Sequence, residues 1–482
     1  MRVLNDRQLE RESPLRELRT IAEQAFSRAA GAPLVSGNQI RLLKDAQENY
    51  PAWLEALASA RATIYFESYI IHADEVGNRF ADLLSQKARE GVRVRLIYDW
   101  FGARGTSSRL FWRRLRKAGV EVRCFNPPRL DSPLEVLSRD HRKMIVVDGR
   151  VAFVSGLCVG RSWVGDAKRG VEPWRDTGVM IEGPAVSDVE QAFAQMWADC
   201  GSPLSEQNAI LFNANVSPAG DVALRIVATQ PNVAGLYRLD QLIAAFARNS
   251  IWLTDAYFLG SAAYVQALKA AARDGVDVRL LLPRTSDIPI VRSLSRTGYR
   301  TLLEEGVRIF EWNGSMLHAK TAVVDGRWAR VGSTNLNLAS WIGNYELDVV
   351  VEDEPFARMM EETYRMDLDH STEIVLSAQH KMRKAKQPMS RSRQGSTRGS
   401  AGRALTGVVA IGTTVGTTMR SHRLLGPAEA PLIIISALIL LGVVALALYW
   451  PRAVSIPVAV IAAWAAFALM VRAFRLRDTN KK

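Results

Sequence analysis

The chain has 482 residues, enough for two ordinary domains and a further segment, and its 48% hydrophobic content excludes an intrinsically disordered protein. Its 62 Lys and Arg residues outnumber its 49 Asp and Glu residues, and the resulting net charge of +13 favours an anionic partner, such as a lipid surface or a nucleic acid. Cys124, Cys158 and Cys200 form no Cys-x-x-Cys pair, which disfavours a disulfide framework or a zinc site, so free thiols in a reducing compartment are predicted.

The chain begins with a predicted helical extension over residues 1–37, whose apolar side chains recur at helical spacing. From residue 38 onward, short strands alternate with helices. The first predicted elements are a strand at Gln39–Leu43, a helix at Tyr50–Ala60, a strand at Thr63–Tyr69, a helix at Phe80–Glu90 and a strand at Val92–Tyr98. This alternation predicts an α/β fold with a parallel or mixed sheet and helices on its faces.

The same order of segments recurs later in the chain. Residues 88–96 resemble residues 272–280, and residues 118–125 resemble residues 305–310. The sequence therefore predicts two similar α/β repeats, at 38–215 and 221–376, related by a pseudo-twofold axis with the active site at their interface.

The composition changes after the second repeat. Residues 377–403 are rich in Ser, Gly, Lys and Arg and are predicted to form a flexible basic linker to a C-terminal membrane region, 404–482. Two uncharged segments, about 431–450 and 453–471, have the length of membrane-spanning helices and predict a transmembrane hairpin. Basic residues on both sides of this hairpin place the catalytic part in the cytoplasm, unless 404–419 also spans and reverses the sides.

Two segments share the pattern His-x-Lys-x-x-x-x-Asp-Gly, one in each repeat. Their marked residues are His141, Lys143 and Asp148 in the first segment, and His318, Lys320 and Asp325 in the second. On a strand, a His and a Lys two residues apart point to the same face, whereas an Asp seven residues after the His points to the other face. Asp148 and Asp325 are therefore predicted to be structural residues that brace the turn after each strand.

Two His and two Lys in one pocket suit chemistry on a phosphodiester. The lysines neutralise phosphate oxygens, one imidazole attacks phosphorus, and the other serves as general acid and base, without a metal or other cofactor. A neutral His needs an acceptor that holds its far nitrogen. Asp176 and Glu346, which lie 35 residues after His141 and 28 after His318, are predicted to orient the histidines.

A phosphate-binding segment comes after the second motif. Gly332 allows close approach of the backbone to a phosphate, while Ser333 and Asn335 supply neutral hydrogen-bond donors. Cys158 stands at the position of Asn335 in the first repeat and is a weaker donor, so the two half-sites are predicted to differ. The aromatic residues Trp174 and Tyr257 are interpreted as packing residues.

The paired motifs, together with 66–69, 175–177 and 344–346, resemble the phospholipase D superfamily, and residues 38–375 resemble bacterial cardiolipin synthases. The resemblance implies a ping-pong phosphatidyl transfer. By position, it implies catalytic roles for His141, His318, Asp176 and Glu346 and phosphate binding by Lys143, Lys320 and Asn335. We favour His141 as the nucleophile.

The resulting hypothesis is a membrane-anchored enzyme of the cytoplasmic membrane that makes cardiolipin from phosphatidylglycerol. Its expected partners are an anionic phospholipid and the bilayer, with no nucleic acid and no obligate protein partner. Two alternatives stay open: a phospholipase D-type hydrolase of lipid or, less favoured, nucleic acid, and a catalytically weak membrane scaffold in which Cys158 marks decay.

Overall fold

The structure, a computed structural model, describes residues 21–128, 138–204 and 216–376, and a few isolated positions between 449 and 464. The chain divides into two compact units, one of Met1–Phe125 with Arg139–Gly412 and one of Asn126–Ser138 with Thr413–Lys482. The first unit holds both sequence repeats apart from residues 126–138, so it contains all of the predicted site residues.

The first repeat contains strands and helices in alternation, as its sequence predicts. Its strands are β1 (Val35–Lys44), β2 (Thr63–Ser68), β3 (Arg93–Asp99), β4 (Glu121–Phe125), β5 (Lys143–Val147), β6 (Val151–Ser155) and β7 (Thr177–Glu182). Its helices are α2 (Asp45–Ser59), α3 (Glu75–Arg89), α4 (Trp100–Ala103), α5 (Arg109–Lys117), α6 (Arg161–Val164), the 3-10 turn η2 (Ala167–Arg169) and α7 (Val186–Asp199).

The second repeat has the same plan. Its strands are β8 (Val222–Thr229), β9 (Ser250–Thr254), β10 (Asp277–Pro283), β11 (Arg308–Trp312), β12 (Thr321–Val324), β13 (Trp328–Gly332), β14 (Glu346–Glu352) and β15 (Ser371–Ile374). Its helices are α9 (Gly235–Phe246), α10 (Ala262–Arg273), α11 (Pro289–Leu303), the π-helix η4 (Ala339–Gly343) and α12 (Glu354–Asp369).

The described strands form one sheet in the order β15-β11-β10-β9-β12-β13-β14-β8-β1-β7-β6-β5-β2-β3-β4. Read outward from the antiparallel β8–β1 pair, the two repeats have the same strand order, and β15 extends the second repeat only. The strands after the two motif histidines, β5 and β12, lie in the middle of their halves and are buried throughout, which fits their apolar sequences.

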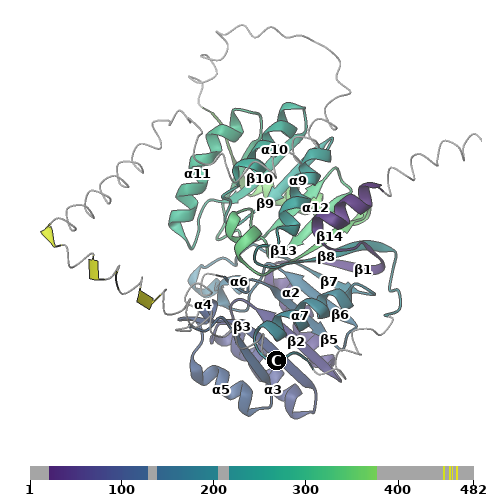
Figure 1. Ribbon diagram of the computed structural model, residues 1–482, viewed down its shortest axis with the longest axis vertical. Coiled ribbons are helices and arrows are strands. Elements are labelled where there is room, and N and C mark those ends of the chain that lie inside the picture. The colour runs from purple at the N-terminus through teal and green to yellow at the C-terminus, as the bar shows by residue number, and fades with distance from the viewer. Residues whose placement is uncertain are drawn as a thin grey trace, which may run out of the picture. The chain divides into compact units, whose positions relative to one another are not determined.

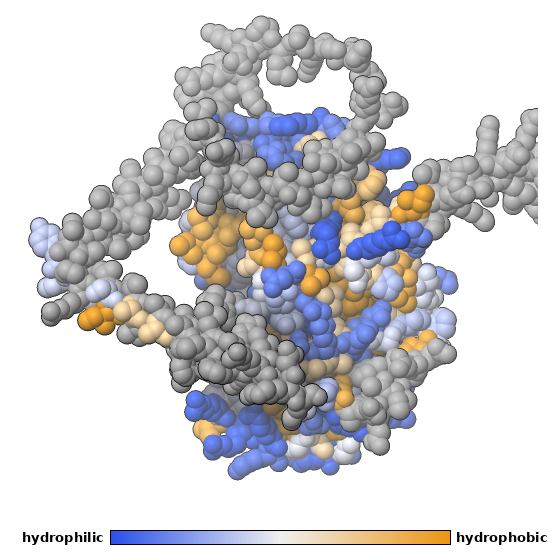
Figure 2. Space-filling model, viewed as in Figure 1, coloured by the Kyte–Doolittle hydropathy of each residue, from blue (hydrophilic) through white to orange (hydrophobic). Residues whose placement is uncertain are grey.

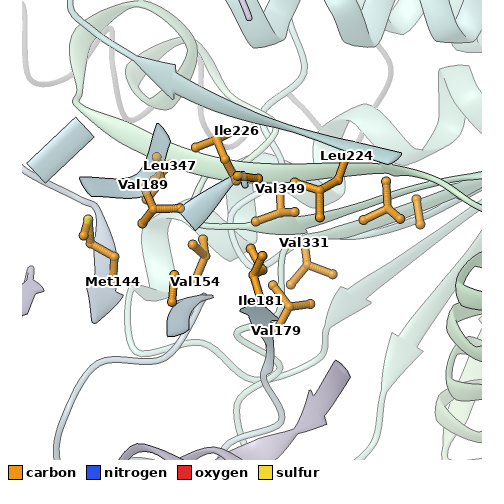
Figure 3. Close-up of a cluster of buried hydrophobic side chains, with 14 of the residues drawn as sticks. Met144, Val154, Val179, Ile181, Val189, Leu224, Ile226, Val331, Leu347 and Val349 are labelled. Atoms are coloured by element: carbon orange, nitrogen blue, oxygen red, sulfur yellow. The ribbon is translucent and has the colours of Figure 1, made fainter. Parts of the chain in front are cut away.

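A buried apolar cluster joins the two repeats. It combines residues of β7, β8, β13 and β14 with helices α7 and α12, and Figure 3 shows side chains such as Val179, Leu224 and Val349 in this cluster. The outer helices α2, α3 and α5 cover the first repeat, and α9 and α10 cover the second, each over its own apolar cluster. Figure 1 shows the two halves and their flanking helices. The shared core fixes the two motif strands within one body.

Element boundaries differ from the predicted ones where a polar cap decides them. α3 begins at Glu75, before the predicted start at Phe80, because the Asp74 carboxylate accepts a hydrogen bond from Gly77 N at 3.0 Å. The N-terminal extension is helical over residues 21–30 and packs on the second repeat, where the Phe26 and Phe246 rings lie 5.9 Å apart.

The predicted linker at 377–403, the segment 404–419 and almost all of the predicted membrane helices lie outside the described residues. Within the part of the chain that the structure describes, no helix combines the length and the apolar character needed to cross a bilayer.

Candidate active site

The motif histidines lie just before their strands rather than within them. His141 precedes β5, which starts at Lys143, and His318 precedes β12, which starts at Thr321. The two-residue spacing still places each Lys beside its His, because Lys143 Nζ donates to the His141 carbonyl and Lys320 Nζ donates to the His318 carbonyl. Each motif therefore presents an imidazole and an ammonium group together.

Backbone hydrogen bonds join each histidine to the other repeat. His141 N donates to the Tyr345 carbonyl at 2.9 Å, and His318 N donates to the Arg175 carbonyl at 2.7 Å. Tyr345 and Arg175 are the residues directly before Glu346 and Asp176. The backbone thus brings each histidine next to the acid that belongs to the opposite repeat.

The side chains complete this crossed arrangement. His141 Nδ1 lies 2.8 Å from Glu346 Oε2, and His318 Nδ1 lies 2.7 Å from Asp176 Oδ2. Both acids are fully buried. The sequence singled out the four residues but did not reveal the crossing, because the repeats alone do not show which strand end meets which histidine. We call His141, Lys143 and Glu346 the first half-site, and His318, Lys320 and Asp176 the second half-site.

The proton on His318 can be placed from its neighbours. Nδ1 lies 2.7 Å from Asp176 Oδ2 and 3.0 Å from Lys320 Nζ. A carboxylate only accepts and an ammonium group only donates, so Nδ1 cannot bond both. The shorter contact to the carboxylate assigns the hydrogen to Nδ1 and leaves Nε2 as the basic, nucleophilic nitrogen.

Burial and charge keep both imidazoles neutral at neutral pH. Burial lowers the pKa of His318 to about 4, with Lys320 acting in the same direction and Asp176 opposing, and burial also lowers the pKa of His141 against the opposing effect of Glu346. Burial alone would raise the pKa of both acids, but the neighbouring His and Lys outweigh it, so the pKa of Asp176 falls to about 2 and that of Glu346 is also lowered. Burial lowers the pKa of Lys320 to about 8.

Different groups hold the two carboxylates. Ser333 Oγ donates to Glu346 Oε2 at 2.6 Å and accepts from Leu347 N, so its hydroxyl is engaged with the acid and the backbone. The indole of Trp163 donates to Asp176 Oδ2 at 3.0 Å. Gly156 stands at the position of Ser333 in the first repeat, and a Cβ there would lie 2.2 Å from Asp176 Oδ1, so only glycine leaves room for the acid.

The motif aspartates face away from this chemistry. The Asp148 carboxylate accepts from the backbone N–H groups of residues 61–63, and that of Asp325 from those of residues 248–250, each at 2.7–2.9 Å. Both aspartates have positive φ, 52°, in the turn after their strand. They tie that turn to the start of the neighbouring strand, β2 or β9.

A cavity of about 740 Å³ lies between the repeats and is lined by both histidines. Asn335 and Cys158 also line it, one from each repeat, and the buried Asn335 Oδ1 atom has no hydrogen-bond partner among the residues that the structure describes. Ser333, Lys143 and Lys320 are not among the lining residues. The cavity is therefore the place where a phosphodiester can reach both imidazoles.

Aromatic side chains form part of the cavity wall, and the interpretation of Trp174 and Tyr257 as packing residues is incomplete, although Trp174 does pack against the apolar cluster of the first repeat. Both line the cavity, with ring centroids 5.6 Å and 6.0 Å from that of His318, and Tyr69 stands 5.0 Å from His141. Their position in the sequence could have identified two of these residues as part of the site. Tyr69 and Tyr257 come after β2 and β9, and the strands that pair with β2 and β9 follow the motif histidines. Composition alone did not separate them from core aromatics.

Comparisons with known proteins give the family. The family model described as cardiolipin synthase, PLD-like domain, matches residues 53–197 and 240–368. A cardiolipin synthase of Alkalihalophilus pseudofirmus is 34% identical over 350 residues, covering 72% of this chain and 69% of that protein. Cardiolipin synthase A of Pseudomonas fluorescens is 32% identical over 369 residues, covering 76% of this chain and 75% of that protein.

A solved structure supports the fold. A phosphatidylserine synthase of Haemophilus influenzae superposes with a TM-score of 0.56 at 14% identity, covering 73% of this chain and 91% of that one. The match of both repeats to the family model, with relatives above 30% identity over most of the chain, shows that this protein belongs to the cardiolipin synthase family with phospholipase D-like domains.

Proposed function

We propose that the protein joins two phosphatidylglycerol molecules into cardiolipin and releases glycerol, through a phosphohistidine intermediate. The observation that carries this proposal is the pair of neutral histidines, each bonded to a buried acid of the opposite repeat, that line one cavity. Family membership supplies the lipid class of the substrate.

In the first step, Nε2 of His141 attacks phosphorus, the P–N bond forms, and the bond from phosphorus to the glycerol oxygen breaks. His318, which gains a proton on Nε2 when the phosphodiester anion binds, gives that proton to the glycerol oxygen, so free glycerol leaves. We assign the attack to His141 because, among the described aromatic residues, one ring, that of Tyr69, contacts it, whereas Trp163, Trp174 and Tyr257 enclose His318.

In the second step, neutral His318 takes the proton of a headgroup hydroxyl on the second phosphatidylglycerol, and that oxygen attacks phosphorus. The P–N bond breaks and cardiolipin leaves, with His141 again neutral and His318 again carrying the Nε2 proton that it had in the first substrate complex. His318 is neutral in the empty site, so the bound phosphodiester anion supplies the field that favours its protonated form.

Lys143, Lys320 and Asn335 are proposed to hold the phosphate oxygens, where negative charge grows in the transition state. For Ser333 the contacts favour a different role, which is to hold Glu346, since its hydroxyl donates to that acid at 2.6 Å. Asp176 and Glu346 are proposed to orient the imidazoles, and Asp148 and Asp325 to be structural.

The same geometry serves a phospholipase D-type hydrolase if water replaces the acceptor alcohol. Transfer is favoured because aromatic and aliphatic side chains, including Tyr69, Trp174 and Leu259, form much of the cavity wall and disfavour water at the intermediate. The scaffold alternative is disfavoured because both His–acid pairs are intact.

We further propose that the catalytic repeats, 38–215 and 221–376, come after a helical extension at 1–37 and precede a basic linker at 377–403 and a membrane region at 404–482. Helices at about 431–450 and 453–471 would anchor the protein in the cytoplasmic membrane with its catalytic part in the cytoplasm. The uncharged composition of both segments and their basic flanks support this proposal.

The test uses full-length protein in liposomes that contain phosphatidylglycerol as the only lipid. Cardiolipin, phosphatidic acid and free glycerol are measured together for the wild type and for His318→Ala. Cardiolipin with equimolar glycerol, lost in the variant, is the expected result. Phosphatidic acid without cardiolipin would make the protein a hydrolase.

A further inference from the structure

Exposed apolar side chains gather around the opening of the catalytic cavity. Four large apolar residues that line the cavity are also exposed at the surface, with exposed fractions from 37% to 53%: Phe101, Leu259, Ile288 and Leu338. Soluble domains rarely leave several such residues together at one opening, since each exposed apolar surface is unfavourable in water.

The apolar surface continues outward along α11. Ile290 and Leu294 are one helical turn apart, so they lie on the same face of α11, and they are 68% and 40% exposed. Figure 2 shows apolar surface gathered over the end of α11 that lies nearer the boundary between the halves. We call the six residues Phe101, Leu259, Ile288, Ile290, Leu294 and Leu338 the apolar rim.

The rim is built by both repeats. Phe101 belongs to α4 of the first repeat, whereas the other members belong to the segment after β9, to the start of α11 and to the segment leading into η4 of the second. Four of these residues, from distant parts of the sequence, converge around the cavity that they line, and the other two extend the surface along α11. That convergence favours a common function over scattered surface exposure.

Cationic side chains accompany the rim. Arg104 is exposed directly after α4, with its guanidinium 5.7 Å from the Trp100 ring centroid. Arg284 is exposed directly after β10, and it accepts at its carbonyl from Arg292, which lies on the other side of α11 from Ile290 and Leu294. An apolar surface edged by arginines matches the interface of an anionic bilayer.

We propose that the apolar rim docks the catalytic body onto an anionic lipid bilayer, so that phosphatidylglycerol enters the cavity directly from the membrane. This inference rests on the proposed function, because it takes the substrate to be a lipid. A bilayer fits better than a protein partner, since a protein on the rim would close the cavity that the substrate must enter. The rim lies within the catalytic repeats and shares no residue with the predicted C-terminal hairpin.

The first experiment places an environment-sensitive NBD fluorophore on the full-length protein through Ile290→Cys, outside the cavity. Leu110→Cys on α5 is the matched control, because Leu110 is 70% exposed and does not line the cavity. The unsubstituted protein gives the background from its own cysteines. In phosphatidylglycerol vesicles with brominated acyl chains, we expect strong quenching at position 290 and little at 110. Equal quenching at both positions would overturn the proposal.

The second experiment measures rates for the Ile290→Ser, Leu294→Ser double variant and for Leu110→Ser. We expect the rim variant to lose about tenfold in activity on vesicles, yet to stay within about twofold of wild type on short-chain phosphatidylglycerol dissolved as monomers. An equal loss on both substrates would assign the rim to the fold or the cavity and overturn the proposal.

The outcomes separate this inference from the proposed function. If the wild type forms no cardiolipin while the label at position 290 is quenched by lipid, the proposed function fails and the docking surface stands. If the label responds to protein concentration in place of lipid, the rim binds a second copy of the chain and docking on a bilayer is wrong.

Discussion

His141 and His318 each bond an acid from the opposite repeat, but their surroundings differ. Trp163, Trp174 and Tyr257 stand within 6.0 Å of the His318 ring, centroid to centroid, and the Lys320 ammonium lies 3.0 Å from its Nδ1. Tyr69 is the aromatic partner of His141, and no corresponding Lys143 contact to Nδ1 occurs among the described residues. A nearly symmetric frame thus carries two unequal half-sites.

This difference fits a division of labour. A nucleophile needs an accessible nitrogen, and a proton carrier benefits from an enclosed site in which a single charge has a strong effect. The two similar repeats give each histidine an acid on its Nδ1, which both roles require. The residues around each histidine make the two environments different. Substitutions in each half-site can show whether the two have separate roles or are equivalent copies.

The largest expected effects come from removing the histidines. His141→Ala and His318→Ala should each lower cardiolipin formation at least about 10³-fold. A phosphatidyl ester of p-nitrophenol distinguishes the roles of the two histidines, because its leaving group needs no proton. The rate of p-nitrophenol release in the first turnover is measured here and for every variant below, because the second step still needs His318 as a base. In His318→Ala this rate should return to within about tenfold of wild type, and in His141→Ala no release should occur. Rescue of His141→Ala alone would reverse the two roles.

Asp176→Asn and Glu346→Gln should each cost about 10²-fold, because an amide no longer fixes the imidazole tautomer. Crossed pairing predicts that the p-nitrophenyl substrate rescues Asp176→Asn, the partner of His318, and leaves Glu346→Gln impaired. Circular dichroism during thermal unfolding controls for the loss of a buried charge. The opposite pattern of rescue would mean that each acid serves the histidine of its own repeat during catalysis.

Much of this arrangement could be predicted from the sequence, because two copies of a motif leave a strong signal in residue spacing. The repeats, the α/β alternation and the residues of both half-sites all come from such local patterns. The crossed pairing of histidines and acids could not be predicted in this way, since Tyr345 and Arg175 contact the histidine segments through backbone hydrogen bonds that no residue type encodes. The residues of the cavity wall could not be predicted either, because an aromatic residue that follows a strand has the same sequence pattern in a core and at a cavity.

The pH dependence of kcat/KM should report the charge on Lys320 in the second half-site. Burial lowers the pKa of Lys320 to about 8, so its charge is present below pH 8 and lost above it. Binding of an anionic substrate weakens with that charge, and kcat/KM should fall about tenfold per pH unit above pH 8. In Lys320→Arg, which stays charged, this descending limb should disappear from the profile. A limb at the same pH in the arginine variant would assign it to another group.

Asn335 and Cys158 occupy matching positions in the two repeats and both line the cavity. Replacing either residue by the other should have smaller effects than the changes above. Asn335→Cys removes a neutral donor proposed to bind phosphate and should cost about tenfold in kcat/KM, the value of one hydrogen bond. Cys158→Asn should change kcat/KM by less than about threefold, because it only adds one neutral donor to a cavity in which Asn335 already supplies one. A gain above about tenfold would show that Cys158 weakens the wild-type site.

The smallest expected effects concern the groups that hold the two carboxylates. Ser333→Ala removes a donor to Glu346, and Trp163→Phe removes a donor to Asp176, and each should cost about threefold to tenfold. Because these acids serve different histidines, the deficit of Trp163→Phe should vanish with the p-nitrophenyl substrate while that of Ser333→Ala persists. If the deficit of Trp163→Phe also persists, the indole acts by shaping the cavity and not by holding Asp176. The functional difference between the two half-sites would then come from the aromatic residues around each histidine more than from the acid that each histidine bonds.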